Sequence, residues 1–156
     1  DLYTPHVFAS VLRTDFADGL HGFSCEGSGC FYDQGAAAAV VSGEESSALA
    51  LDEAMDLSEA VELKVAFRYL PTEMSEDDEI RVELSDGQSW APILTLRRGA
   101  EFSDGDFFND STDYGYVRVS AEAAAFASDA RVRLRVVSRS VDATVSVEEL
   151  GVYVRD

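Results

Sequence analysis

The chain has 156 residues and a formal net charge of −18, from 12 basic and 30 acidic residues. A hydrophobic content of 46% and an aromatic content of 10% indicate one globular domain with its own core and exclude a disordered chain. A surface this negative repels phosphates, which argues against nucleic-acid binding. No apolar run reaches the roughly 18 residues of a membrane span. Three explanations of the acidity stay open: plain solubility, adaptation to a saline or Ca²⁺-rich exterior, and cation binding.

The N-terminal third predicts short strands joined by turns. Segment 7–12 (VFASVL) predicts an edge strand. Segment 15–30 predicts a loop rich in Gly and Asp, with Phe16, Leu20 and Phe23 turned inward. The apolar runs 36–41 and 47–51 are separated by SGEES and have the pattern of a hairpin.

The two cysteines, Cys25 and Cys30, flank the sequence Glu-Gly-Ser-Gly, which allows the chain to bend back on itself. A local disulfide is favoured over two free thiols. A zinc site needs two more ligands nearby, and His21 alone does not complete one. A disulfide would place the protein in an oxidising compartment and predicts a secreted or extracellular location.

The clearest strand signal is segment 61–70 (VELKVAFRYL), where apolar residues occupy every second position. Segments 79–85 (EIRVELS) and 130–137 (ARVRLRVV) alternate in the same way. Strict alternation indicates a strand with one wet and one buried face. The acidic segment 52–59 leads into the first of these strands, with one helical turn.

The segments between and after these strands predict further strands and loops. Segment 90–96 predicts a strand in which Pro92 marks an edge position or a bulge. Segment 97–112 predicts a long polar loop with aromatic anchors, and 114–120 another strand.

The C-terminal end completes an all-β arrangement. Segment 121–127 predicts one helical turn, and 144–154 predicts the last strand, with Gly151 marking a bulge. Eight or nine strands without a long helix predict a two-sheet antiparallel β-sandwich, a jelly roll in particular.

The second half of the chain resembles bacterial jelly-roll modules related to MAM domains and carbohydrate-binding modules. The likeness lies in the order FSDGDFFND, YVRV, ARVRLRVV and TVSVEELGVYV. VELKVAFRYL with EIRVELSDGQSW resembles the central strand pair of those modules, which are appended to secreted peptidases and polysaccharide-degrading enzymes. The resemblance implies that residues 1–156 are a single module of a larger secreted protein, with parent enzyme domains in the same chain.

The resemblance also implies a structural Ca²⁺ between the opening loop and the last strand. The matching positions are Asp15, Asp18 and Glu149, although the family has Asp-Asp where this chain has Glu148-Glu149. A second group of oxygen ligands comprises Asp104, Asp106, Asn109 and Asp110. Its alternative explanation is an ordinary polar turn, because its spacing is not that of an EF-hand.

Two alternating strands carry basic side chains on their polar faces. They are Arg131, Arg133 and Arg135 on 130–137, and Lys64 and Arg68 on 61–70. If the strands are neighbours, these residues form a basic stripe for an acidic polysaccharide, because arginine forks bind carboxylates and sulfates bidentately. The alternative is cross-strand pairing with acids such as Glu62 or Glu83.

Aromatic residues offer a second mode of glycan binding, by stacking. Trp90 and Tyr116 are the candidates, and Tyr114, Phe107 and Phe108 are further exposed possibilities. The alternative is that these rings belong to the core, as most aromatic side chains do. Because Phe107 and Phe108 are adjacent, at least one of them points away from the core.

No set of catalytic residues stands out. His6 and His21 are the only histidines, and neither adjoins a Ser or Cys nucleophile motif. Carboxylates are too abundant to single out a glycosidase-like pair. The sequence therefore predicts a non-catalytic module that binds a polysaccharide or cell-surface glycan. The alternatives are a structural or protein–protein interaction domain and a small jelly-roll lyase or hydrolase.

Overall fold

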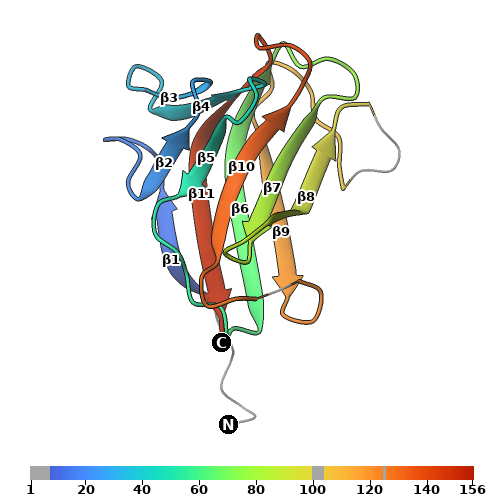
Figure 1. The fold of residues 1–156 in the computed structure, drawn as a ribbon. Coiled ribbons are helices and arrows are strands. Elements are labelled where there is room, and N and C mark those ends of the chain that lie inside the picture. Colours follow the sequence, from blue (N-terminus) through green and yellow to red (C-terminus); the bar gives the residue numbers. More distant parts are fainter. Residues whose placement is uncertain (1–7, 100–103, 125) are drawn as a thin grey trace.

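The computed structural model describes residues 8–99, 104–124 and 126–156, which form two sheets packed face to face (Figure 1). The strands are β1 (Ala9–Thr14), β2 (Phe23–Glu26), β3 (Cys30–Asp33), β4 (Ala38–Ser42), β5 (Ala48–Leu51), β6 (Glu62–Thr72), β7 (Glu79–Ser85), β8 (Trp90–Arg97), β9 (Asp113–Ser120), β10 (Arg131–Val137) and β11 (Thr144–Arg155). The predicted all-β antiparallel sandwich is confirmed. In these three ranges no helix is long and apolar enough to span a membrane.

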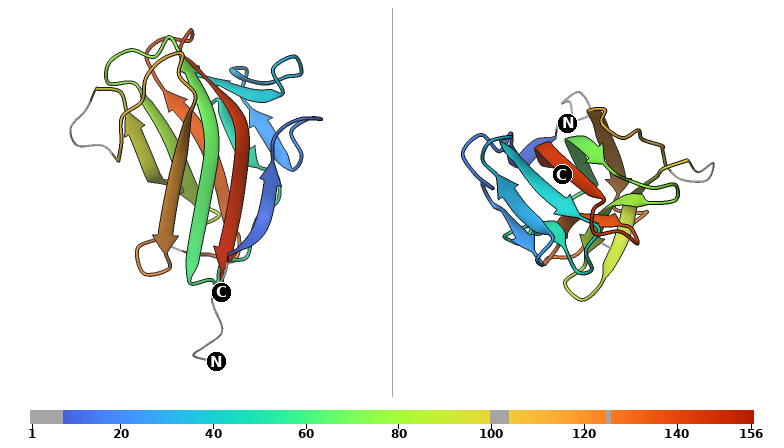
Figure 2. Two further views of the ribbon diagram at one scale, coloured as in Figure 1. Left: turned by 180° about the vertical axis from the view of Figure 1, so that it is seen from behind. Right: turned by 90° about the horizontal axis from the view of Figure 1, so that it is seen from above.

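The two sheets divide the strands almost equally. Sheet A has the order β3-β4-β11-β6-β9, and β1 pairs with β11 as well. Sheet B has the order β2-β5-β10-β7-β8. Sheet B faces the viewer in Figure 1, and sheet A is in front in the left view of Figure 2. The long strands β6 and β11 pair over their whole length and form the centre of sheet A.

The alternation of the sequence decides which side chains form the core. The inward residues of β6 and β10 are each at most 5% exposed, and they are Leu63, Val65, Phe67, Tyr69, Val132, Leu134 and Val136. Their neighbours in sequence therefore point to the outer faces of the sandwich. Because β6 lies in sheet A and β10 in sheet B, Lys64 and Arg68 stand on the opposite side from the arginines of β10. The two sets do not form one basic stripe.

Two expected strand pairings are wrong. Segments 36–41 and 47–51 do not form a hairpin, because β4 pairs with β3 and β11 in sheet A, whereas β5 pairs with β2 and β10 in sheet B. Every residue of β4 and β5 is buried, so the apolar pattern of these strands carries no information about their partners. In the same way β6 and β7, which resemble a central pair, lie in different sheets.

The cysteine loop contains more regular structure than expected. Strand β2 lies inside the predicted loop and β3 begins at its last residue, one at the edge of each sheet. The predicted disulfide between Cys25 and Cys30 is present, with 5.1 Å between the two Cα atoms, and it links the edges of the two sheets. Phe16 and Phe23 are buried as predicted, and Leu20 packs partly buried against the core.

Of the remaining local predictions, the one for Pro92 is confirmed and the others are wrong. Pro92 lies in the edge strand β8 beside a register shift, as predicted. The bulge in β11 lies between Val147 and Glu149 and not at Gly151. The helical turns expected in 52–59 and 121–127 are turns and bends without helix in the described part of these segments.

Candidate functional site

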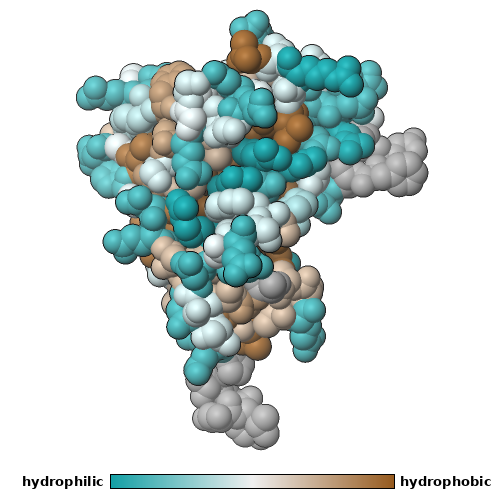
Figure 3. All heavy atoms as spheres, viewed as in Figure 1, coloured by the Kyte–Doolittle hydropathy of each residue, from teal (hydrophilic) through white to brown (hydrophobic). Residues whose placement is uncertain are grey.

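The outer face of sheet B is covered by arginines and glutamates, and we call it the arginine face. It comprises Arg81, Arg97, Arg131, Arg133, Arg135, Glu79 and Glu83. Cross-strand register places Arg133 opposite Glu83 and Arg135 opposite Arg81. Figure 3 shows hydrophilic side chains spread over the middle of this face.

Two buried glutamates anchor four of these arginines. Glu83 Oε1 lies 2.7 Å from Arg133 Nε and 3.0 Å from Arg135 Nε, and its side chain is only 5% exposed. Glu79 in the same way contacts Arg81 and Arg97, at 2.6 and 2.7 Å. Burial tends to raise the pKa of Glu79, but hydrogen bonds from the two arginines outweigh it and hold this pKa below its ordinary value. Of the acids considered in the sequence, Glu83 thus pairs with Arg133 and Arg135 of β10.

The three arginines of β10 are held mainly through Nε, and Arg131 also forms an ion pair from Nη2 to Glu26 at 3.9 Å. Arg131 Nε donates to the carbonyl of Leu51 at 2.7 Å, while Arg133 and Arg135 contact Glu83 through Nε. Within the described residues, the terminal NH₂ groups of these three arginines make no hydrogen bond to the protein. The Arg133 guanidinium also lies 4.2 Å over the Trp90 ring, so an arginine covers this face of the indole.

The outer face of sheet A instead carries a cluster of tyrosines around a hollow, and we call Tyr114, Tyr116 and Tyr153 with their surroundings the tyrosine face. Tyr114 is 70% and Tyr116 53% exposed. Between Tyr116 and Tyr153 the sheet carries only Ala66 and Gly151, which are paired neighbours on β6 and β11. A Cβ at Gly151 would lie 2.5 Å from Tyr153 Oη, so glycine lets this ring lie across the strand. The result is a hollow of about 260 Å³.

Charged side chains stand at the rim of this hollow. Arg13 of β1 and Glu149 of β11 line it, and Arg13 makes no ion pair within the described residues. Arg68 lies 3.0 Å from Glu148 and 3.4 Å from Glu149. The nearby Tyr114 side chain is the main cause that raises the pKa of Arg68. The rings are thus surrounded by fixed donors and acceptors.

Ion pairs link the strands of sheet A at the end where β6 begins. Glu62 accepts hydrogen bonds from Arg118 at 2.6 Å and from Arg155 at 2.6 Å. The hydrogen bond from Arg118 is the main cause that lowers the pKa of Glu62 to about 2. Lys64 has no carboxylate partner in the described residues, and its Nζ lies over the rings of Tyr153 and Phe8 at 4.5 and 5.1 Å.

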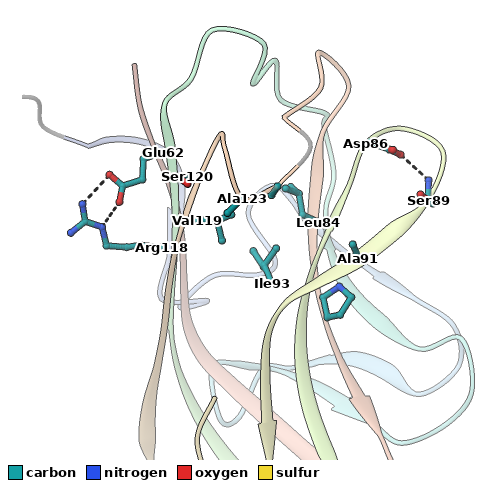
Figure 4. A pocket seen from close by; sticks show the side chains of 12 residues that line it. Glu62, Leu84, Asp86, Ser89, Ala91, Ile93, Arg118, Val119, Ser120 and Ala123 are labelled. Carbon is teal, nitrogen blue, oxygen red and sulfur yellow. Dashed lines mark hydrogen bonds and ion pairs between the residues drawn. The ribbon is translucent and has the colours of Figure 1, made fainter. Parts of the chain in front are cut away.

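A hollow of about 660 Å³ lies where the edge strands β8 and β9 face each other (Figure 4). Leu84, Ile93, Val119 and Ala123 point toward one another in its middle, and the Glu62–Arg118 pair lies at one side. None of the described residues that line it is aromatic. It therefore offers few groups that suit a sugar ring.

The residues proposed for calcium are only partly brought together. Asp15 and Glu149 line a shared hollow with His21 and Arg13, whereas Asp18 does not line it. The described residues contain no group of three or more His, Cys, Asp or Glu side chains placed to hold a metal. Calcium binding here stays a prediction. His6 lies outside the described residues.

The second group of oxygen ligands forms structural hydrogen bonds. Asp104 Oδ2 accepts from the Thr95 amide at 2.7 Å, Asp106 Oδ1 accepts from the Gly99 and Phe107 amides, and Asn109 exchanges hydrogen bonds with the backbone of Met74. These contacts favour the polar-turn interpretation of this loop. Phe107 is 1% exposed and Phe108 71%, so one ring of the pair points outward as expected.

Sequence reasoning placed several site residues on the right faces but missed others. Tyr153, Arg13 and Glu79 were not singled out. The alternation in the last strand would have turned Tyr153 outward, but its closeness to Tyr116 depends on β6 lying between β11 and β9. That strand order is set by contacts across the whole fold, and no local pattern encodes it.

The comparisons with known proteins gave matches only among solved structures. No protein family and no curated protein matches the sequence. The xylan-binding module CBM15 superposes with a TM-score of 0.65 at 8% identity, covering 96% of this chain and 97% of that one. A variant of the family 29 module CBM29-2 complexed with cellulohexaose gives 0.58 at 10% identity, covering 94% and 90%.

A third match is a larger protein, the Clostridium thermocellum endo-1,4-beta-D-xylanase 10B, as its CBM22-1–GH10 modules complexed with xylohexaose. The TM-score is 0.62 at 12% identity, and the match covers 94% of this chain but 28% of that one. At such low identities the likeness shows the fold alone. The chain therefore has the jelly-roll β-sandwich of carbohydrate-binding modules.

Proposed function

We propose that this chain is a non-catalytic carbohydrate-binding module that holds a polysaccharide on its arginine face. The observation that carries the proposal is the row formed by Arg131, Arg133 and Arg135. Each guanidinium is held through Nε, and within the described residues only Arg131 uses a terminal NH₂ group as well, in a 3.9 Å ion pair with Glu26. On one face of a strand such groups recur about every 6.6–6.8 Å.

Such a row suits a glycan that carries carboxylates or sulfates. The planar end of arginine forms paired hydrogen bonds with these groups. Because Glu83 and the Leu51 carbonyl already hold the three side chains, less conformational entropy is lost when a ligand binds. The net charge of −18 does not attract a polyanion from a distance, so the affinity depends on these short contacts.

The similar structures support a role as an accessory module. One of them is described as a xylan-binding module, and another combines a CBM22-1 module with a GH10 module. The Cys25–Cys30 disulfide is typical of oxidising compartments and supports secretion. In the proposed function, the module docks parent enzyme domains of the same secreted chain onto their substrate.

Affinity electrophoresis in gels containing polygalacturonate, a sulfated glycan or neutral xylan tests the proposal. We expect retardation by an acidic polysaccharide, and an affinity at least about tenfold lower for the Arg133→Ala/Arg135→Ala variant. Arg139→Ala is the matched control, because this exposed arginine lies in the turn after β10 and outside the arginine face. Unchanged binding by the double variant, or release of new reducing ends from any of these polysaccharides, would contradict the proposal.

A further inference from the structure

We infer that the tyrosine face is a second carbohydrate site, which takes the ring of a neutral sugar on the side of the sandwich opposite the arginine face. The inference goes beyond the proposed function, because it concerns another sheet, other residues and another ligand chemistry. Figure 2, left, shows the strands β9, β6 and β11 that build this face, on the far side from sheet B.

The shape of the face sets the size of the ligand. The Tyr153 ring lies over Gly151, and the small side chain of Ala66 leaves a gap between this ring and Tyr116. The hollow of about 260 Å³ is slightly smaller than the roughly 300–1,000 Å³ of pockets for drug-sized ligands. Its size therefore fits one sugar ring, with the rest of a glycan lying across the sheet.

The chemistry of the face points to a sugar and not to an apolar partner. Tyr114 and Tyr116 offer exposed rings, whereas an arginine covers the ring of Trp90 on the other sheet. A pyranose has apolar C–H faces that pack on such rings and a polar edge that needs hydrogen bonds. The tyrosines are ringed by charged groups, which an apolar partner would leave buried without hydrogen bonds.

The charges at the rim favour a neutral sugar over an acidic one. Arg13 provides donors and Glu149 provides acceptors at the same hollow, and a sugar diol uses both. The charges of Arg13, Arg68, Glu148 and Glu149 cancel at this rim, so a sugar carboxylate gains no net attraction. The hollow therefore gives an acidic sugar no electrostatic advantage over a neutral one, in contrast to the arginine face.

The test separates the two faces by working in the Arg133→Ala/Arg135→Ala background. Isothermal titration calorimetry with neutral hexasaccharides of glucose, xylose, mannose or galactose measures binding to the remaining face. In this background we expect at least one of the four to bind. Tyr116→Ala should weaken that binding about tenfold, because a stacking ring is lost.

A second variant tests the hollow without removing a ring. Ala66→Leu fills the gap between Tyr116 and Tyr153 with a larger side chain. It is expected to weaken binding of the same hexasaccharide by a similar factor. Phe31→Ala is the matched control, since Phe31 is 53% exposed on the edge strand β3 of the same sheet and does not line the hollow. Its affinity should stay within about twofold of the background protein. Thermal melts verify that each variant is folded.

Each outcome either supports the second site or overturns it. Loss of binding in Tyr116→Ala and Ala66→Leu, with Phe31→Ala unchanged, supports the second site even if the arginine face binds nothing. Because the double variant leaves Glu83 without its two arginines, the titrations are repeated in the parent protein. The inference is overturned if none of the four hexasaccharides binds to folded protein in either background. It is equally overturned if one binds and neither Tyr116→Ala nor Ala66→Leu weakens it.

Discussion

At the scale of single residues, the arginine face depends on Glu83. Its carboxylate is 5% exposed and lies beneath two arginines whose own side chains are 20% and 30% exposed. A buried acid of this kind is stable only while it is paired, and the arginines in turn need its charge. Glu83 thus stabilises the fold and positions the Arg133 and Arg135 guanidiniums together.

Glu83→Gln is therefore expected to lower the free energy of unfolding by about 2 kcal/mol, less than a fully buried pair would lose because the arginines are partly exposed. Urea unfolding measures this loss. Glu148→Gln is the control, since Glu148 is 25% exposed and pairs with Arg68 near the surface, where ion pairs contribute little. Equal losses in both variants would contradict the role given to burial.

The lowered pKa of Glu62, which lies in sheet A, predicts that the stability of the protein depends on pH. Hydrogen bonds from Arg118 and Arg155 hold its pKa at about 2, against 4.5 for an ordinary glutamate. Because the folded pKa is the lower one, this contribution to stability is complete above pH 4.5 and is lost as the pH falls toward 2. Melting temperatures measured across this range should therefore fall.

Glu62→Gln removes the titrating group and should flatten that part of the curve. Its melting temperature should lie below that of the parent protein at pH 6 and approach it at pH 2.5. A constant difference between the two proteins over this range would contradict the assigned pKa.

The face of the sheet to which each side chain points was largely predictable from alternation. Arg131, Arg133 and Arg135 point to one outer face as expected, because a strand turns every second side chain the same way. The partners of these residues were less predictable. Glu83 was one of several acids considered, and the Arg133–Trp90 contact depends on the register of β10, β7 and β8.

At the scale of elements, strands with one wet face were predictable and strands buried on both sides were not. Segment 61–70 alternates and forms β6, which the structure extends to Thr72. Strands β4 and β5 are buried throughout, so their alanines, valines and leucines fit either sheet. The chain crosses from one sheet to the other between them, and this crossing has no signal in local sequence.

The disulfide belongs to this scale because it joins the edge strands β2 and β3 of different sheets. It closes a loop with a sequence separation of only 5 residues. The chain-entropy relation gives about 2 kcal/mol for a loop this short. Cys25→Ser/Cys30→Ser is expected to lose about that much stability, as measured by urea unfolding.

Glycan binding by the same variant is the control. The disulfide joins β2 and β3, whereas the arginine face is built on β7, β8 and β10 and the tyrosine face on β6, β9 and β11. Dissociation constants should therefore stay unchanged. A protein that no longer folds at all would show that the two sheets depend on this link far more than loop closure explains.

At the scale of the whole molecule, charge is divided between strands and loops. Ten of the 12 basic residues lie in strands, together with only eight of the 30 acidic ones. The rest of the chain carries two basic and 22 acidic residues, so its excess of negative charge exceeds that of the protein as a whole. Composition gave the total charge, but its division became visible only with the strand boundaries.

This division predicts that salt stabilises the protein. Raising NaCl from 0.1 to 1 M shortens the screening length from about 10 to about 3 Å, which weakens repulsion between exposed loop carboxylates. The partly buried pairs of Glu79 and Glu83 are screened much less. The melting temperature should rise by roughly 2–4 °C for each kcal/mol of repulsion that is relieved.

A variant of the acidic loop between β6 and β7 shows whether the loops are the cause. Glu76→Gln/Asp77→Asn removes two exposed negative charges and should raise the melting temperature at 0.1 M NaCl, with a smaller further gain at 1 M. Chloride is used because sulfate stabilises folded proteins by exclusion from their surface, whatever their charge. If salt instead lowers the melting temperature, the ion pairs on the two sheet faces contribute more than loop repulsion removes. The stability of the sandwich would then depend on its strands' charges and not on those of its loops.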